Sequence, residues 1–146
     1  MEREKITGEV FIEQLKVKNI FEFAERFKAV SGGSATEIVE VILASAISLE
    51  ASDIHIEPFA ELLAGKEEEK AKIRIRIDGI LHDVIIFDFK IYKLLLSRIK
   101  LLSGIKLNIT NKPQDGRFTI SSSGTLIEIR ASTLPSEHGE TIVLRI

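Results

Sequence analysis

The chain has 146 residues, of which 45% are hydrophobic and 29% charged, a composition that suits one folded domain with a single core. Its net charge of -2 comes from 20 basic and 22 acidic residues. The basic excess typical of nucleic-acid-binding proteins is therefore missing, and we expect no nucleic-acid partner. The absence of cysteine excludes a disulfide framework and a cysteine nucleophile. The charged start predicts no signal peptide, and no apolar run approaches the roughly 18 residues of a spanning helix, so we expect a soluble protein.

Two helices are predicted in the first third of the chain. Phenylalanines at near-helical spacing predict a short helix from about Asn19 to Val30, and we expect them to pack on the domain's own core rather than on a neighbouring domain. After a break at 31–33, Ser34 and Glu37 match a capping box. The helix that they open is expected to end near Leu49, with a buried stripe formed by Ile38, Val39, Ile42, Leu43, Ala46 and Ile47.

Three strands are predicted next. Residues 53–57 alternate strictly between polar and apolar side chains and indicate a strand that ends at Pro58. The charged run 65–70 is typical of a solvated hairpin tip. Residues 72–77 alternate again, and Asp78-Gly79 predicts a tight turn to a partner strand over 80–87.

A further helix and three more strands complete the predicted domain. Asp88 is expected to cap a helix over about 89–103, which Gly104 ends. Strands are predicted over 117–121, 126–132 and 141–146, with a turn near 113–116 and a long polar loop over 133–140. This order predicts an α+β domain with a largely antiparallel sheet and both main helices packed against it.

One strand face resembles a metal or acid/base array. Asp53, His55 and Glu57 share that face, and His82 and Asp83 are possible further members. The solvent face of a half-exposed strand shows the same pattern, so we predict no metal site.

Two arginines form the main candidate site. Arg117 and Arg130 fall on the polar side of neighbouring predicted strands, so they emerge near one another if those strands pair. Planar guanidinium groups suit phosphate oxygens better than lysines do. Solvent exposure, or pairing with Asp115, Glu128 or Glu140, is the alternative that the spacing leaves open.

The chain lacks the motifs of a self-sufficient catalyst. Neither Gly-x-x-x-x-Gly-Lys-Ser/Thr nor Gly-x-Gly-x-x-Gly occurs, so we do not expect it to hydrolyse a nucleotide unaided. His138 has no accompanying Gly-x-Ser-x-Gly nucleophile elbow.

An ordered series of motifs resembles one protein family. The motifs are Ala51-Ser52-Asp53-Ile54-His55-Ile56-Glu57-Pro58, Arg74-Ile75-Arg76-Ile77-Asp78-Gly79, Ser97-Arg98-Ile99-Lys100, Pro113-Gln114-Asp115-Gly116-Arg117, Arg130-Ala131-Ser132-Thr133-Leu134-Pro135 and His138-Gly139-Glu140. Together they are similar to the N-terminal domain that precedes the catalytic core of type II secretion and type IV pilus assembly ATPases, over about 34–146. Residues 61–72 are longer and more charged than the family pattern, and 1–30 do not resemble the family's more distal N-terminal domain.

The resemblance implies a PAS-like α+β domain over 34–146, preceded by a linker or helical extension over 1–33. It implies a RecA-like ATPase domain on the same polypeptide. That catalytic domain has the Walker A motif, is absent from this chain, and is the main binding site for ATP and Mg²⁺. Arg117 and Arg130 match the positions from which the family's arginines reach the ATP phosphates, in the manner of arginine fingers. The further implied partners are neighbouring subunits of a hexamer and a membrane platform protein, at the cytoplasmic face of the inner membrane.

Three hypotheses of function follow. The first is a non-catalytic domain of a secretion or pilus ATPase, whose arginines contribute to ATP turnover and couple it to domain rotation. The second is a free-standing PAS-like interaction or sensor module without ATPase function, and the third is a metal-dependent hydrolase that uses Asp53, His55 and Glu57. A Walker A motif about 50 to 70 residues downstream in the reading frame would favour the first hypothesis over the second.

Overall fold

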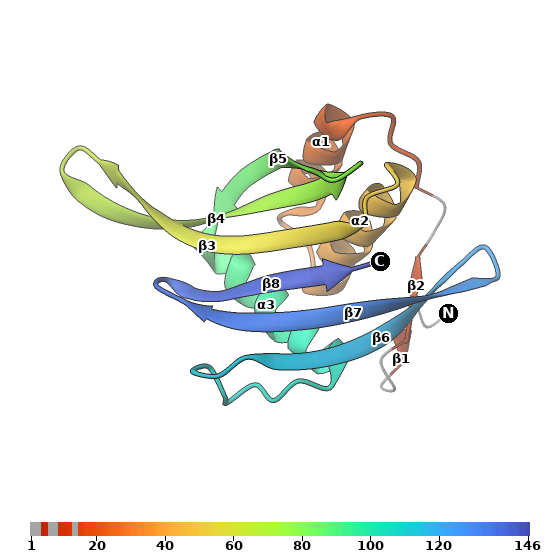
Figure 1. The fold of residues 1–146 in the computed structure, drawn as a ribbon. Coiled ribbons are helices and arrows are strands. Elements are labelled where there is room, and N and C mark those ends of the chain that lie inside the picture. The colour runs from red at the N-terminus through yellow and green to blue at the C-terminus, as the bar shows by residue number, and fades with distance from the viewer. Residues whose placement is uncertain (1–3, 6–8, 13–14) are drawn as a thin grey trace.

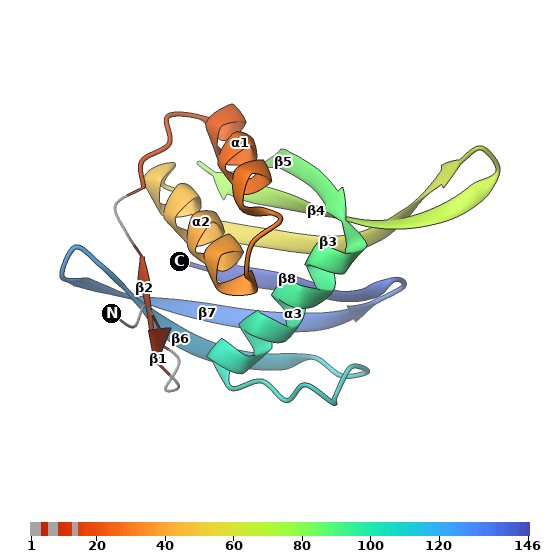
Figure 2. The same ribbon diagram turned by 180° about the vertical axis from the view of Figure 1, so that it is seen from behind.

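The computed structural model describes residues 4–5, 9–12 and 15–146. In that part of the chain, three helices lie on one side of a single sheet (Figures 1 and 2). The helices are α1 (Ile20–Val30), α2 (Ala35–Ser48) and α3 (Phe89–Ser103). The strands are β1 (Glu4–Lys5), β2 (Glu9–Ile12), β3 (Asp53–Leu63), β4 (Lys66–Ile77), β5 (Ile80–Asp88), β6 (Gln114–Ser122), β7 (Thr125–Ser136) and β8 (Gly139–Arg145).

The strand order is β1-β2-β6-β7-β8-β3-β4-β5. Every neighbouring pair from β6 to β5 is antiparallel, whereas β2 runs parallel to β6 and antiparallel to β1. Near the middle of the sheet β3 pairs with β8, which brings the first strand of the predicted domain beside its last. The predicted α+β class, with a largely antiparallel sheet and helices packed against it, is confirmed.

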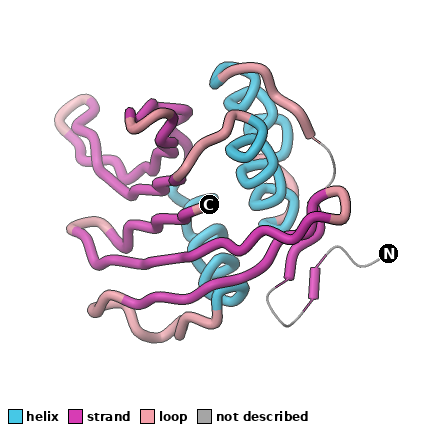
Figure 3. The backbone as a smooth tube through the Cα atoms, turned by 45° about the vertical axis from the view of Figure 1, so that its right-hand side comes forward, coloured by secondary structure: helices cyan, strands magenta, loops and turns pink. Residues whose placement is uncertain are grey.

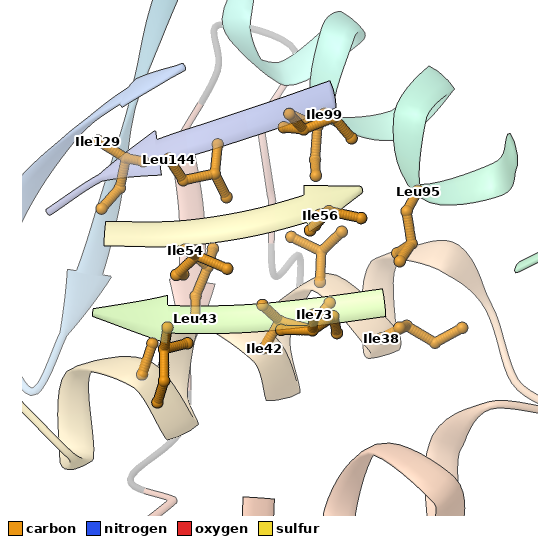
Figure 4. Packing of buried hydrophobic residues seen from close by; sticks show 14 of the residues in the cluster. Ile38, Ile42, Leu43, Ile54, Ile56, Ile73, Leu95, Ile99, Ile129 and Leu144 are labelled. Carbon is orange, nitrogen blue, oxygen red and sulfur yellow. The ribbon is translucent and has the colours of Figure 1, made fainter. Parts of the chain in front are cut away.

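The core fills the space between the sheet and the helices (Figure 4). Isoleucines of β3 and β4 meet the apolar stripe of α2 on one side and α3 on the other. The buried residues shown there are Ile38, Ile42, Leu43, Ile54, Ile56, Ile73, Leu95, Ile99, Ile129 and Leu144. The opposite face of the sheet, which we call the open face, therefore keeps most of the charged side chains of the central strands.

The predicted helices are confirmed together with their end signals. Asn19 caps α1, whose Phe23 and Phe27 are buried in the domain's own core. The predicted capping box opens α2, with both reciprocal bonds between Ser34 and Glu37 in place. The N-cap of α3 is Asp88, and its end is Gly104 in the left-handed conformation that favours glycine.

The first hairpin is longer than predicted, and the prediction that Pro58 ends the strand was wrong. β3 continues to Leu63, and only Ala64 and Gly65 form the turn, so residues 66–70 belong to β4 rather than to a hairpin tip. The pairing of β3 with β8 ends at Ile56. At Pro58 the strand therefore has a neighbour on one side only, a place where proline is tolerated.

The predicted polar loop over 133–140 was also wrong. β7 runs to Ser136 and β8 begins at Gly139, so a two-residue turn of Glu137 and His138 replaces the loop (Figure 3). The predicted turn near 113–116 is likewise mostly strand, because β6 begins at Gln114.

The N-terminal residues add elements that were not predicted. β2 is only four residues long and extends the sheet by pairing with residues 119–122 of β6. The predicted boundary between a linker or helical extension over 1–33 and a PAS-like domain over 34–146 stays a prediction. Within the described ranges, no helix is both long enough and apolar enough to cross a membrane.

Candidate functional site

Three arginines form a row across the open face of the sheet. Arg117 on β6 is the direct cross-strand partner of Arg130 on β7, and Arg130 is in turn the partner of Arg145 on β8. Directly opposed side chains of antiparallel strands share a face and lie about 5 Å apart at their Cβ atoms. The prediction that Arg117 and Arg130 emerge near one another is confirmed. We call Arg117, Arg130 and Arg145 the arginine row.

Among the described residues, the partners of Arg117 and Arg130 are loose. Both approach the carboxylate of Glu128 at 3.8 Å, which is too long for a hydrogen bond. Their side chains are 74% and 76% exposed. Each guanidinium therefore keeps most of its donors available for another group.

Arg145 is oriented by a buried carboxylate. Its Nε donates a hydrogen bond of 3.0 Å to Asp53 Oδ1, and the Ser52 hydroxyl donates one of 2.8 Å to Oδ2. Arg76 lies on the other side, with Nε 3.5 Å from Oδ2. Burial alone would raise the pKa of Asp53, but the hydrogen bonds from Ser52 and Arg145 and the two guanidinium charges bring that pKa below its usual value. Asp53 is thus an ionised anchor, while the rest of the Arg145 side chain stays exposed.

The arginine row lines a shallow pocket of about 680 Å³. Its other walls are Asp115, Gly116, Ala131, Ser132 and Val143. Asp115 is the acidic residue of the lining, and its carboxylate accepts a hydrogen bond of 2.7 Å from the Ser132 hydroxyl. Like charges placed directly opposite one another destabilise a sheet, so a bound anion would relieve the repulsion within the row. A group with several anionic oxygens, such as a phosphate, suits three neighbouring forked donors.

The end of α3 fixes the start of β6 beneath this pocket. At Gly116 a Cβ would overlap the main-chain carbonyl oxygen of Ser103, the last residue of α3. The close approach of helix and strand therefore requires a glycine directly before Arg117. The side-chain amide of Gln114 adds hydrogen bonds of 3.0 Å to the carbonyls of Lys106 and Ile109 in the loop between the two elements.

The residues that resemble an acid/base array have structural partners. Glu57 accepts two hydrogen bonds of 2.8 Å from Arg74, and His55 Nδ1 lies 3.9 Å from Glu57. Burial lowers the pKa of His55, which favours its neutral form. No three His, Cys, Asp or Glu residues in the described part of the chain are placed to hold a metal ion.

The sequence reasoning missed Arg145, although a signal was present. Thr141, Val143 and Arg145 alternate with Ile142 and Leu144, so Arg145 belongs on the same face as the other two arginines. Its neighbours could not be foreseen, because Asp53 is 92 residues away in the sequence. His138 lies in the β7–β8 turn, 3.8 Å from Glu67 and apart from the arginine row.

Fold and site together define an α+β domain with three arginines along one pocket and no glycine-rich phosphate-loop motif in its sequence. The family described as type II/IV secretion system protein matches residues 28–146. The chain therefore belongs to this family, as its motifs indicated.

Individual relatives agree with this assignment. The chain is 40% identical over 109 residues to the type II secretion system protein E of Aeromonas hydrophila, and 40% identical over 112 residues to the type II secretion system ATPase E of Vibrio cholerae serotype O1. Each alignment covers 75% of this chain and 20% of the relative. The type II secretion system protein HxcR of Pseudomonas aeruginosa is 35% identical over 139 residues, which is 95% of this chain and 28% of the relative. The chain thus spans about a fifth of the length of the first two relatives.

Proposed function

We propose that this chain is a non-catalytic domain of a secretion or pilus-assembly ATPase, and that the arginine row contacts the phosphates of ATP held by a RecA-like domain of the same polypeptide. The observation that supports the proposal most is the direct cross-strand alignment of Arg117, Arg130 and Arg145 over one pocket. The Vibrio cholerae relative is named as an ATPase, which agrees with a nucleotide as the source of the anion.

The chemistry assigned to the row is electrostatic. In phosphoryl transfer, negative charge spreads over the equatorial oxygens of the transferring group, and planar guanidinium groups stabilise it without forming a covalent bond. In this proposal Arg117 and Arg130 contact the phosphates directly, and Arg145, which Asp53 orients, is a third donor. ATP and Mg²⁺ would be bound mainly by the RecA-like domain, since this chain has no phosphate-loop motif.

The same contact would couple ATP turnover to movement. Arginines on one domain meet a phosphate on another only when the two domains close, so nucleotide binding and release can drive a rigid-body rotation. Arg145 directly precedes Ile146, so a segment that continues from Ile146 starts beside the row. In a hexamer at the cytoplasmic face of the inner membrane, this rotation would push against a membrane platform protein.

The test replaces each arginine of the row by alanine in the full-length protein. We expect Arg117→Ala and Arg130→Ala to lower kcat for ATP hydrolysis by about tenfold or more, since arginine fingers contribute roughly 10³ to 10⁵ at most. Arg117→Lys keeps the charge but loses the forked donors, so an intermediate rate is expected. Arg26→Ala, an exposed arginine on α1, is the matched control and should leave the rate unchanged.

Thermal unfolding of the same variants separates function from folding. Because Arg117 and Arg130 are mostly exposed and make only loose contacts, the melting temperature of their variants should change little. Arg145→Ala removes the hydrogen bond to the buried carboxylate of Asp53, so a lower melting temperature is expected for that variant. Wild-type ATPase rates in the Arg117 and Arg130 variants, or loss of the fold in these two, would contradict the proposal. The 146-residue chain alone should show no ATPase activity. A natural gene with no downstream Walker A motif would instead favour the free-standing module.

A further inference from the structure

The β3–β4 hairpin extends beyond the sheet as an isolated two-stranded ribbon. Pairing with β8 ends at Ile56, and pairing with β5 begins only at Lys70, so residues 57–69 have no further strand beside them in the described structure. Figure 1 shows this ribbon projecting from the sheet. We call residues 57–69 the β-arm.

The helix-side face of the β-arm is both apolar and acidic. Ile54 and Ile56 point to the core, so Ala60 and Leu62 continue that face along the strand. Their cross-strand partners are Glu69 and Glu67. Leu62 is 74% exposed, and Glu67 lies 3.8 Å from the imidazole of His138. This face therefore offers a leucine flanked by two carboxylates, and neither β3 nor β4 adds a lysine or arginine to it over these residues.

The β-arm is poorly suited to pairing with a second β-arm. On its other face, Glu61 and Glu68 are direct cross-strand partners, and Lys70 lies 3.9 and 3.8 Å from them. Two such ribbons would bring several carboxylates together, and charged residues of this kind protect strand edges from edge-to-edge association. A complementary surface has to be apolar and basic.

The outward side of α3 is such a surface. Lys90, Leu94, Ser97 and Leu101 follow one another at helical spacing, with Lys93 beside them, and we call these five residues the α3 strip. Leu94 and Leu101 are 52% and 56% exposed. The helix contains no aspartate or glutamate, and no other described element covers its outward side in Figure 2.

We propose that the β-arm of one copy of this chain docks on the α3 strip of a second copy. Leu62 inserts between Leu94 and Leu101, while Glu67 and Glu69 face Lys90 and Lys93. Along a helix the two leucines are about 10 Å apart, which leaves room for one leucine side chain between them. The two glutamates are about 7 Å apart along their strand, a span that two long lysine side chains can match.

This contact repeats head to tail. The two surfaces differ, so every copy can both provide a β-arm and accept one. The contact is smaller than the roughly 1,600 Å² of a standard stable interface, and its ion pairs are exposed, so it is weak alone and sensitive to salt. In an assembly held by other contacts, the raised effective concentration strengthens it. The contact involves none of the arginine row, so it does not depend on the proposed role in ATP turnover.

The absence of native cysteine makes a direct test possible. Chains with Leu62→Cys are mixed with chains with Leu94→Cys and treated with a short bis-maleimide. We expect the mixed dimer to form at least fivefold more than in the matched control, in which Leu62→Cys is mixed with Leu126→Cys. Leu126 is similarly exposed, at 66%, but lies at the opposite end of the sheet.

Charge exchange tests the orientation of the contact. Adding Glu67→Lys and Glu69→Lys to the Leu62→Cys chain should lower the crosslinking at least fivefold. Adding Lys90→Glu and Lys93→Glu to the partner should then restore it, and circular dichroism checks that each variant is folded. Equal yields with the Leu126→Cys control would overturn the proposal. Crosslinking that is unchanged by the glutamate-to-lysine reversal would also overturn it, as would a paired reversal that fails to restore the crosslinking.

Discussion

At the scale of single residues, the arginine row depends on the glycine that precedes Arg117. Gly116 lets β6 run directly against the carbonyl oxygen of Ser103 at the end of α3. Ile105 is the next neighbour, with Cγ1 3.0 Å from the position that a Cβ would take. A side chain here has no space on the helix side, and the backbone that would have to move includes Arg117.

The substitution Gly116→Ala should lower the free energy of unfolding by about 1 to 3 kcal/mol, the usual cost of overpacking a site that cannot relax easily. Gly32→Ala is the matched control, because a Cβ at Gly32 meets nothing within 4 Å. Its stability should stay within about 0.5 kcal/mol of wild type. Urea denaturation of both variants measures the difference, and equal midpoints would show that α3 and β6 can separate at little cost.

At the scale of elements, a buried ion pair and a tyrosine attach α3 to β8. Lys100 Nζ lies 2.7 Å from Glu140 Oε2, and both side chains are 2% exposed. The Tyr92 hydroxyl donates a hydrogen bond of 2.6 Å to the carbonyl of Glu140 and accepts one of 2.8 Å from its amide. Burial, with a contribution from the Glu140 charge, raises the pKa of Tyr92 to about 12, so the hydroxyl keeps its proton. These contacts hold the start of β8 against the helix.

Removing one member of the pair should cost far more than removing both. Lys100→Met leaves the Glu140 carboxylate buried and unpaired, and we expect a loss of about 3 to 5 kcal/mol in the free energy of unfolding. The double variant Lys100→Met/Glu140→Met replaces two charges by side chains of similar volume and should recover most of that loss. Chemical denaturation of the three chains forms the comparison. A double variant no more stable than the single one would mean that the pair has no coupled role.

The elements that the sequence predicted well are those whose signals are local. The caps at Ser34 and Asp88 and the turn at Asp78-Gly79 involve residues within four positions of one another, so chemistry alone places them. The extent of β3 past Pro58 depends instead on where β8 stops, a distant partner that no local pattern reveals. The buried pairing of Lys100 with Glu140 was missed for the same reason, since the two are 40 positions apart.

At the scale of the whole molecule, the two faces of the sheet are stabilised differently. The helix side is mainly apolar, with Lys100 and Glu140 as a buried ion pair, while the open face holds ion pairs that cross from strand to strand. Burial alone would raise the pKa of Glu57, but the hydrogen bonds and charge of Arg74 bring it below the usual value, as Arg145 and Ser52 do for Asp53. Burial also lowers the pKa of His55. All three groups therefore bind protons less readily in the folded state than in the unfolded chain.

Stability should consequently fall with acid in two steps. A lowered histidine pKa contributes stability that is complete above the ordinary value of 6.5 and is lost as the pH falls through the lowered pKa. The lowered carboxyl pKa values act in the same direction at lower pH. The contribution of Asp53 is complete above about its ordinary value of 3.8 and disappears as the pH falls through the pKa of the folded state.

The substitution Asp53→Asn isolates the second step. At pH 7 it removes charge-assisted hydrogen bonds to Arg145 and Ser52, and we expect a loss of about 1.5 to 3 kcal/mol in the free energy of unfolding. Between pH 5 and pH 3 the variant should then lose less further stability than wild type, because asparagine cannot take up the proton that breaks the contact. Asp78→Asn, in the exposed β4–β5 turn, is the control and should follow the wild-type profile. Urea denaturation across this range checks the result. A variant whose stability falls as steeply as wild type would place the acid-sensitive contact elsewhere than beside the arginine row.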